Sequence, residues 1–269
     1  MIGTPAGAAR SPLFQTGGIS LYRGDVLAVL RSIAAASFDA CVTDPPYGER
    51  VARWDGPRCR EWYVAWMREV DRVVVHGGPI LTFAPRRRFD VFMSALREVR
   101  GDPPECPLQM IVWIHRQGFP PAPGYLRPEH EAIIASGRLR VDAEDVHVAR
   151  RDLHAATARA PLDTPDAAAD EPVIRTPIGP NAGTILEARR TRRRDATGHP
   201  TQKPEALVRV LVALTTPPQG RVLDPFCGSG TMLVAARAVG RTAIGIDRSI
   251  RACNLTIRRC ESGTSGQNR

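Results

Sequence analysis

Several features of membrane, secreted and zinc-binding proteins are absent from this sequence. No apolar run is long enough to span a membrane, and the first sixteen residues, rich in Gly, Pro and Ala, lack the apolar core of a signal peptide. The six cysteines form no Cys-x-x-Cys pair and no Cys/His group with zinc-finger spacing. We therefore expect no metal site and a reducing, cytoplasmic location, with cysteines such as Cys41 packed as small apolar residues.

The chain also lacks internal repeats, and its length limits the number of domains. Its 269 residues, 43% hydrophobic and 24% charged, suit one α/β domain with a modest insertion, or at most two domains. The formal net charge of +9 indicates a polyanionic partner, although a genome that favours Arg and Ala would give the same excess.

From Ile19 onward, short apolar runs alternate with amphipathic segments, which is typical of a parallel sheet flanked by helices. Helices are expected over residues 25–35, 60–75, 87–99, 204–214 and 230–239. Strands are expected over residues 38–43, 79–84, 109–115, 130–136, 221–224 and 242–247. We expect a flexible tail over residues 1–18 and a single domain over residues 19–269, interrupted by an irregular insertion over residues 140–198.

A glycine-rich turn follows the strand expected over residues 221–224. It reads Asp224-Pro225-Phe226-Cys227-Gly228-Ser229-Gly230-Thr231. Glycines let the backbone approach a ligand closely, and the next helix offers free N–H groups at its N-terminus. The following strand ends at Asp247, seventeen residues after Gly230, where a carboxylate would meet ribose hydroxyls. The pattern predicts a site for a nucleoside-bearing cofactor.

The same turn excludes two other nucleotide sites. No Gly-Lys-Ser/Thr follows it, so it is not a Walker P-loop, and Leu233 takes the place of the third glycine of the dinucleotide motif. A Gly-x-Gly alone also occurs in tight turns that bind nothing. Its agreement with Asp224 and Asp247 favours the cofactor site.

A second polar loop, Asp44-Pro45-Pro46-Tyr47, follows the strand expected over residues 38–43. The two prolines hold the backbone rigid and remove two N–H donors, which leaves carbonyls and the Asp44 carboxylate facing outward beside an aromatic ring. Such a loop suits a flat substrate that donates hydrogen bonds, namely an amino group on a nucleobase. Taken alone, the same residues also fit a Pro-Pro turn with Tyr47 in the core.

Three motifs in one order resemble those of the beta-class, or permuted, DNA amino-methyltransferases, which make N6-methyladenine or N4-methylcytosine. Asp-Pro-Pro-Tyr at 44–47 resembles their catalytic motif, and Asp-Pro-Phe-Cys-Gly-Ser-Gly-Thr at 224–231 their cofactor loop. His-Pro-Thr-Gln-Lys-Pro at 199–204 resembles the segment before that loop. Tyr-Arg-Gly-Asp at 22–25 and Arg-Pro-Glu-His-Glu at 127–131 are similar to further stretches. The resemblance covers roughly residues 19–260, except for 140–198.

The resemblance implies a Rossmann-like methyltransferase fold, with a mostly parallel twisted sheet, helices on both faces and a circularly permuted motif order. It also implies S-adenosylmethionine as cofactor, double-stranded DNA as partner, and residues 140–198 as the target-recognition segment. A flipped base would stack on Tyr47, and its amino group would donate to Asp44 and to the Pro45 carbonyl. The implied catalytic residues are Asp44, Pro45, Pro46 and Tyr47.

The residues that the resemblance assigns to the cofactor are Asp25, Lys203, Asp224, Pro225, Phe226, Cys227, Gly228, Ser229, Gly230, Thr231 and Asp247. Asp247 would bind the ribose and Asp25 the adenine side. Lys203 would meet the cofactor carboxylate, unless it is an ordinary surface lysine.

A dense basic run would track DNA phosphates, unless it is a solvated loop. Its members are Arg189, Arg190, Arg192, Arg193 and Arg194. The tryptophans at 54, 62, 66 and 113 are expected in the core and are given no role in the site.

Several other functions compete with this interpretation. C5-cytosine methylation needs a nucleophilic Cys after a Pro, and no Pro-Cys pair exists in the chain. RNA methyltransferases with related loops usually carry the cofactor loop first, and a non-catalytic DNA-binding protein would not need intact Asp44, Tyr47 and Gly228. Asp before Pro-Pro favours adenine over cytosine, although class members with Asp modify both. A cognate restriction endonuclease, and a monomer or a homodimer, stay open.

Overall fold

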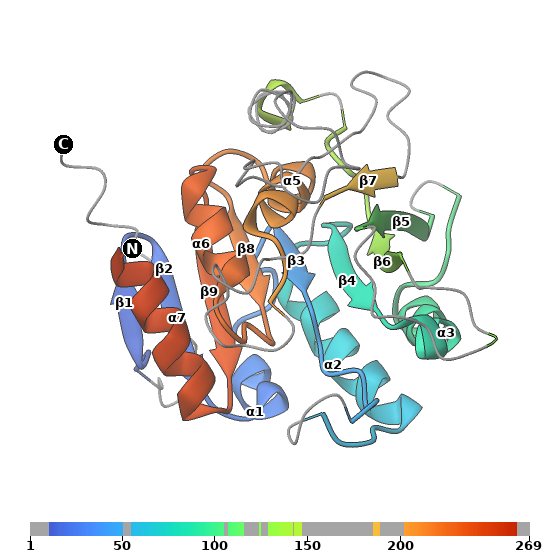
Figure 1. Cartoon of the computed structure of the whole chain (residues 1–269), viewed down its shortest axis with the longest axis horizontal. Coiled ribbons are helices and arrows are strands. Elements are labelled where there is room, and N and C mark those ends of the chain that lie inside the picture. Colours follow the sequence, from blue (N-terminus) through green and yellow to red (C-terminus); the bar gives the residue numbers. More distant parts are fainter. Residues whose placement is uncertain are drawn as a thin grey trace.

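A computed structural model describes residues 11–50, 55–104, 107–115, 124, 129–141, 143–146, 185–188 and 202–262. In these ranges nine strands form one sheet in the order β1-β2-β9-β8-β3-β4-β6-β5-β7 (Figure 1). The strands are β1 (Phe14–Thr16), β2 (Ile19–Arg23), β3 (Ala40–Thr43), β4 (Ile80–Ala84), β5 (Gln109–Ile114), β6 (His130–Ser136), β7 (Ile185–Glu187), β8 (Arg221–Asp224) and β9 (Thr242–Asp247).

The centre of the sheet is a block of parallel strands. The neighbours β2, β9, β8, β3 and β4 all run in the same direction. On one side β1 pairs with β2 in the antiparallel sense. On the other, β6 runs antiparallel to both β4 and β5, and β7 lies parallel to β5. The carboxyl ends of the five central strands therefore lie at one edge of the sheet.

Helices cover both faces of this sheet (Figure 1). They are α1 (Val26–Arg31), α2 (Arg60–Val73), the 3-10 helix η1 (Arg86–Arg88), α3 (Phe89–Arg100), α5 (Glu205–Thr215), α6 (Thr231–Ala238) and α7 (Ile250–Ser262). Cys41 and Ile80 pack with α1, α2 and α3, whereas the adjacent residues Val42 and Leu81 pack with α5 and α6. Successive strand residues face opposite sides, so the central strands are apolar on both faces. None of the helices in the described ranges is long and apolar enough to cross a membrane.

The expected architecture, a mostly parallel sheet with helices on both faces, is confirmed. The strands expected over residues 130–136, 221–224 and 242–247 have the observed bounds. The helix expected over residues 25–35 ends sooner, at Arg31, where Ser32 forms its C-cap. Trp66 and Trp113 are buried in the core as expected, and Trp54 lies outside the described residues.

Two expected boundaries differ from the structure. Phe14–Thr16 forms the edge strand β1, so the part of the expected tail over residues 11–18 that the structure describes joins the sheet. Ile185–Glu187 forms the other edge strand, β7, inside the insertion expected over residues 140–198. The indole Nε1 of Trp113 donates to the carbonyl of Ala188 at 2.7 Å, which fastens β7 to the core. A three-residue strand carries too little pattern to be recognised in the sequence.

Gly230 leads from the loop after β8 into α6, and its backbone has a conformation that only glycine adopts easily. Its φ is +76°, and a Cβ there would lie 2.7 Å from Thr256 Cγ2 on α7. Thr256 is fully buried and β-branched, so it has little freedom to move aside. Gly240 has a similar φ of +73° with nothing within 4 Å of the corresponding position.

These two glycines form a matched pair for a stability test. We expect Gly240→Ala to lower the free energy of unfolding by about 1 kcal/mol, from the positive φ alone. Gly230→Ala should lower it by about 2–4 kcal/mol, because steric overlap in a packed region adds to the same strain. Urea denaturation followed by circular dichroism measures both, and equal losses would contradict the role given to Thr256.

Candidate functional site

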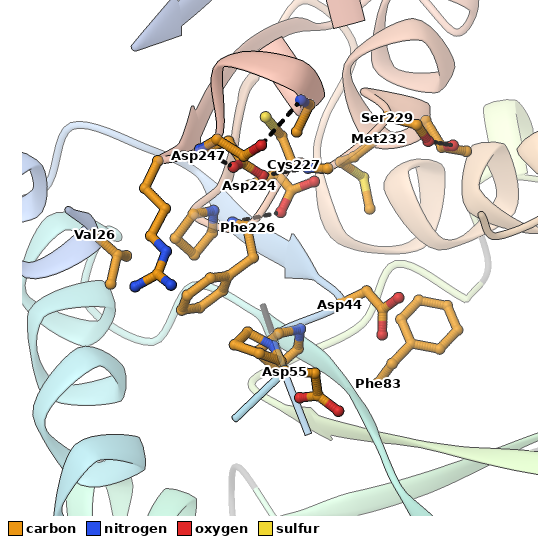
Figure 2. Close-up of a pocket in the computed structure, with 18 of the residues that line it drawn as sticks. Val26, Asp44, Asp55, Phe83, Asp224, Phe226, Cys227, Ser229, Met232 and Asp247 are labelled. Carbon is orange, nitrogen blue, oxygen red and sulfur yellow. Dashed lines mark hydrogen bonds between the residues drawn. The ribbon is translucent and has the colours of Figure 1, made fainter. Parts of the chain in front are cut away.

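A cavity of about 460 Å³ opens at the carboxyl edge of the parallel strands. Asp25 follows β2, Asp247 ends β9, Asp224 ends β8 and Asp44 follows β3, and all four line the cavity. Phe83, near the end of β4, closes it on the side of Asp44 (Figure 2). Parallel strands end at the same edge of a sheet, so acids far apart in the sequence meet here.

The loop after β3 holds its acid and its aromatic residue in direct contact. The Tyr47 hydroxyl donates to Asp44 Oδ1 at 2.6 Å. Burial, and then the charge of Asp44, raise the pKa of the Tyr47 phenol well above its usual value, so Tyr47 stays a donor at neutral pH. The Pro46 carbonyl accepts a hydrogen bond from Tyr63 on α2 at 3.2 Å. The expectation that the carbonyls of this loop face outward is therefore wrong for Pro46, which is bound from inside the protein.

Asp55 fixes the continuation of this loop, a role that the sequence did not suggest. Its carboxylate accepts from the backbone N–H groups of Gly48, at 2.6 Å, and Glu49, at 3.0 Å. Its side chain is fully buried and also lines the cavity. These bonds hold the residues after Tyr47 in a fixed path.

Asp224 joins the loop after β8 to the strand before the other loop. Its Oδ1 accepts from the Thr43 hydroxyl at 2.7 Å and from the Phe226 backbone N–H at 3.1 Å. Thr43 is the last residue of β3 and lies 181 positions earlier in the chain. Burial raises the pKa of Asp224 to about 7, even though these two hydrogen bonds act in the opposite direction.

Asp247 holds the glycine turn against the end of β9. Its Oδ2 accepts from the Gly228 backbone N–H at 3.0 Å, and its Oδ1 from the Ser249 N–H at 2.8 Å (Figure 2). Gly228 has a φ of +53°, which favours glycine at this turn. Burial raises the pKa of Asp247. Each carboxylate oxygen carries a second lone pair, so Asp247 can also accept hydrogen bonds from a pair of ligand hydroxyls.

A cluster of aromatic rings forms part of the cavity wall. The Phe226 ring lies 5.7 Å from that of Trp62 and 5.2 Å from that of Trp66, centre to centre. The Arg58 guanidinium lies 5.1 Å from the Trp62 ring. Trp62, which is expected in the core, is half-buried and lines the cavity, and so does Arg58, for which no role is expected. Burial raises the pKa of the Cys227 thiol well above its usual value, which favours packing over reactivity.

Three residues expected to contact the cofactor are engaged differently in the structure. Gly230 does not line the cavity and instead packs against Thr256. Asp25 lines the cavity, while its Oδ1 caps α1 by accepting from the N–H groups of residues 27 and 28 at 3.1 Å each. The Lys203 ammonium lies 2.9 Å from Asp44 Oδ2 and 3.1 Å from Glu131 Oε2.

The structure thus brings most of the expected site residues around one cavity. All four residues of the Asp44–Tyr47 loop and ten of the eleven expected cofactor residues line it, Gly230 being the exception. The basic run at 189–194 lies outside the described residues. Residues that line the cavity without having been expected include Asp55, Arg58, Trp62, Phe83, Met232, Arg248 and Arg251.

A family model described as DNA methylase, N6_N4_Mtase, matches residues 38–258. The chain is 26% identical over 273 residues to the Type II methyltransferase M.ScaI of Streptomyces caespitosus, covering 95% of this chain and 85% of that protein.

Solved structures share the fold. The PvuII DNA methyltransferase (cytosine-N4-specific) matches with a TM-score of 0.68 at 16% identity, covering 93% of this chain and 89% of that one. The M1.HpyAVI-SAM complex matches with a TM-score of 0.58 at 21% identity, covering 90% of this chain and 99% of that one.

The buried acid Asp224 should reduce the stability of the protein at neutral pH. Its pKa of about 7 in the folded state lies above the usual 3.8, so the stability that the protonated form provides is lost as the pH rises from about 4 to 7. Asp224→Asn removes the buried charge but keeps the oxygen that accepts from Thr43. We expect this variant to melt a few degrees higher than the wild type at pH 8.

The pH dependence provides the control for this prediction. The difference in melting temperature should shrink as the pH falls from 8 to 5, because the folded wild type takes up the proton. Differential scanning calorimetry over this range measures it. A difference that does not change with pH would contradict the assignment to the carboxyl charge.

Proposed function

Because the chain belongs to the N6_N4_Mtase family of DNA methylases, we propose that it transfers a methyl group from S-adenosylmethionine to the exocyclic amine of a base flipped out of double-stranded DNA. The observation that carries this proposal is the meeting of two loops in one cavity. The Asp44–Tyr47 loop supplies acceptors for an amine, and the loop after β8 supplies a nucleoside site beside it. The Thr43–Asp224 hydrogen bond fixes one loop against the other.

The residues at the β8 and β9 end of the cavity fit S-adenosylmethionine. Asp247 would accept from the ribose hydroxyls, and the buried Asp224 would face the positively charged amino group of the methionine part. The rings of Phe226 and Trp62 would form an apolar wall. When bound, S-adenosylmethionine supplies a methyl group on a cationic sulfur, which leaves with the bonding electron pair when an amine takes the methyl group.

At the other end of the cavity, the protein would orient the amine. By the resemblance, Asp44 would accept one N–H and the Pro45 carbonyl the other. The Pro46 carbonyl already accepts a hydrogen bond from Tyr63. Two acceptors in fixed positions turn the nitrogen lone pair toward the methyl carbon. The transient positive charge on nitrogen is stabilised by the Asp44 carboxylate until one proton leaves to solvent.

Contact with DNA phosphates is assigned first to the run at 189–194. A second basic segment, not expected from the sequence, supports a DNA-binding face at the same edge of the sheet. Arg86 and Arg87 are exposed directly after β4, and their side chains form no hydrogen bond or ion pair with any part of the chain that the structure describes. We also infer that the protein acts in the cytoplasm. Because its relative M.ScaI is named a Type II methyltransferase, we infer in addition that a restriction endonuclease accompanies this protein.

N6 of adenine is the favoured target, because the residue before Pro45-Pro46 is an aspartate. N4 of cytosine is the second candidate, because the PvuII enzyme named as cytosine-N4-specific shares the fold with a TM-score of 0.68. Expression in cells without their own DNA methylases, followed by direct sequencing of modified bases, gives the base and its sequence context together. DNA without any new mark would count against the proposed function.

Asp44 allows chemistry and cofactor binding to be tested separately. We expect Asp44→Ala to lower methyl transfer at least about 100-fold, because an acceptor for the reacting amine is lost. Its affinity for S-adenosylmethionine, measured by calorimetry, should change less than about threefold, which is below 1 kcal/mol. The reason is that the variant keeps the residues at the β8 and β9 end of the cavity, which are assigned to the cofactor. Asp102→Ala, in an exposed loop after α3, is the control and should leave both unchanged. Full modification by the Asp44 variant would overturn the catalytic assignment.

The role of the second basic segment is tested by the salt dependence of DNA binding. Replacing Arg86 and Arg87 together with Ala should reduce the slope of log affinity against log salt by about 2, since each lost phosphate contact accounts for about 0.9. Arg31→Ala, an exposed arginine on α1, is the control. Fluorescence anisotropy with a short duplex measures the slope, and an unchanged slope would remove these residues from the DNA interface.

A further inference from the structure

Lys203 lies in the part of the cavity where the base would bind. Its ammonium contacts Asp44 Oδ2 at 2.9 Å and Glu131 Oε2 at 3.1 Å, so one cation bridges two carboxylates. Its side chain is only 10% exposed. The Phe83 ring centre lies 4.8 Å from Nζ and the Tyr47 ring centre 5.6 Å, both in the range of cation–π attraction.

The order of the chain explains this placement. Lys203 stands immediately before Pro204, the N-cap of α5, and α5 packs against β3 and β4. The lysine therefore projects toward the ends of these two strands. The glycine turn expected to bind the cofactor follows β8. The ion pairs of Lys203 do not involve that turn, and they connect Lys203 to β6 and to the loop after β3.

The two carboxylates keep this lysine charged. Burial alone lowers the pKa of an amine, but the charges of Asp44 and Glu131 outweigh that effect and raise the pKa of Lys203 above its usual value. Two carboxylates and one ammonium leave a net charge of −1 beside the reacting amine. This charge would offset the positive charge that the nitrogen acquires as the methyl group arrives.

We propose that Lys203 is a positioning residue of the catalytic pocket, which keeps the Asp44 carboxylate ionised and oriented toward the target amine, and that Glu131 anchors it there. This role rests on the proposed function and replaces the cofactor contact expected for Lys203. Tyr47 holds one oxygen of Asp44 and Lys203 the other, so the carboxylate cannot rotate. Glu131 holds the ammonium in place when the amine competes for Asp44.

The proposal has a consequence for pH dependence. Without the cation, Asp44 lies beside the charges of Glu131 and Asp224, and among the described residues the Tyr47 hydroxyl is the side-chain donor that it keeps. Like charges at such range favour uptake of a proton by one of them. A protonated Asp44 is a poorer acceptor and gives less stabilisation to a cationic nitrogen. Removing the charge of Glu131 as well relieves the repulsion and should restore ionisation of Asp44.

The experiment compares the wild type, Lys203→Met and the double variant Lys203→Met/Glu131→Gln. Single-turnover transfer of a radiolabelled methyl group to unmethylated bacterial DNA is followed from pH 5.5 to 9 with saturating S-adenosylmethionine. Saturation keeps the titration of Asp224 from affecting the comparison. Cofactor affinity is measured separately by calorimetry, and folding by thermal melts.

For Lys203→Met we expect the acid limb of the pH–rate profile to move up by about 1–2 pH units. Above the acid limb the rate should still be roughly 10–100-fold lower than that of the wild type, because the Asp44 carboxylate is free to rotate away from the amine. Cofactor affinity should change less than about threefold. The double variant should return the acid limb to within about half a unit of the wild type. It also serves as the second variant if Lys203→Met alone folds poorly, because it has the same net charge of −1 at this position as the wild type.

Three results would overturn the proposal. A loss of cofactor affinity of about tenfold or more with an unmoved acid limb would return Lys203 to the cofactor site. An acid limb that stays raised in the double variant would remove Glu131 from the role. Absence of transfer by the wild-type protein would overturn the proposed function itself, and this role with it. Transfer by the wild type together with either of the first two results would overturn the role of Lys203 or of Glu131 alone.

Discussion

The hydrogen bond from Thr43 to Asp224 is the contact on which the geometry of the whole site depends. It joins neighbouring parallel strands, β3 and β8, at the point where each turns into a functional loop. An unpaired buried carboxylate is costly, so Asp224 needs this donor, and Thr43 is one residue before Asp44. The position of the Asp44–Tyr47 loop is thereby tied to that of the loop after β8 by a single hydrogen bond. Methyl transfer requires such a fixed separation, because nucleophile and electrophile must approach in line.

Much of the fold and of the site could be predicted because the informative residues are local. The run from Asp224 to Thr231 follows an apolar strand and contains glycines whose positive φ the turn requires. The Asp44–Tyr47 loop likewise follows a buried strand. Each motif shows its own chemistry, and the parallel arrangement brings both to one edge of the sheet.

The unpredicted parts depend on contacts between distant segments. Lys203 is near the cofactor loop in sequence, yet its partners, Asp44 and Glu131, come from a different loop and from β6. Nothing in the local sequence separates a lysine that meets a cofactor from one that meets a catalytic acid. The edge strands β1 and β7 have only three residues each, too few for a period-two pattern to appear. Their formation depends on the neighbouring strands that they complete.

The charges around the cavity explain why so costly an arrangement is retained. Asp224 and Asp247 have pKa values raised by burial, so each destabilises the protein when ionised. Lys203 lies between Glu131 and Asp44 and offsets part of the cost of burying these two carboxylates. The two buried acids Asp224 and Asp247 are poorly satisfied when the cavity is empty and would be better satisfied by a cationic ligand. On the proposed function, these acids should stabilise the cationic cofactor and the transient cation on the target amine more than the neutral product. The same electrostatics that lower the stability of the empty protein would therefore favour binding before transfer and release after it.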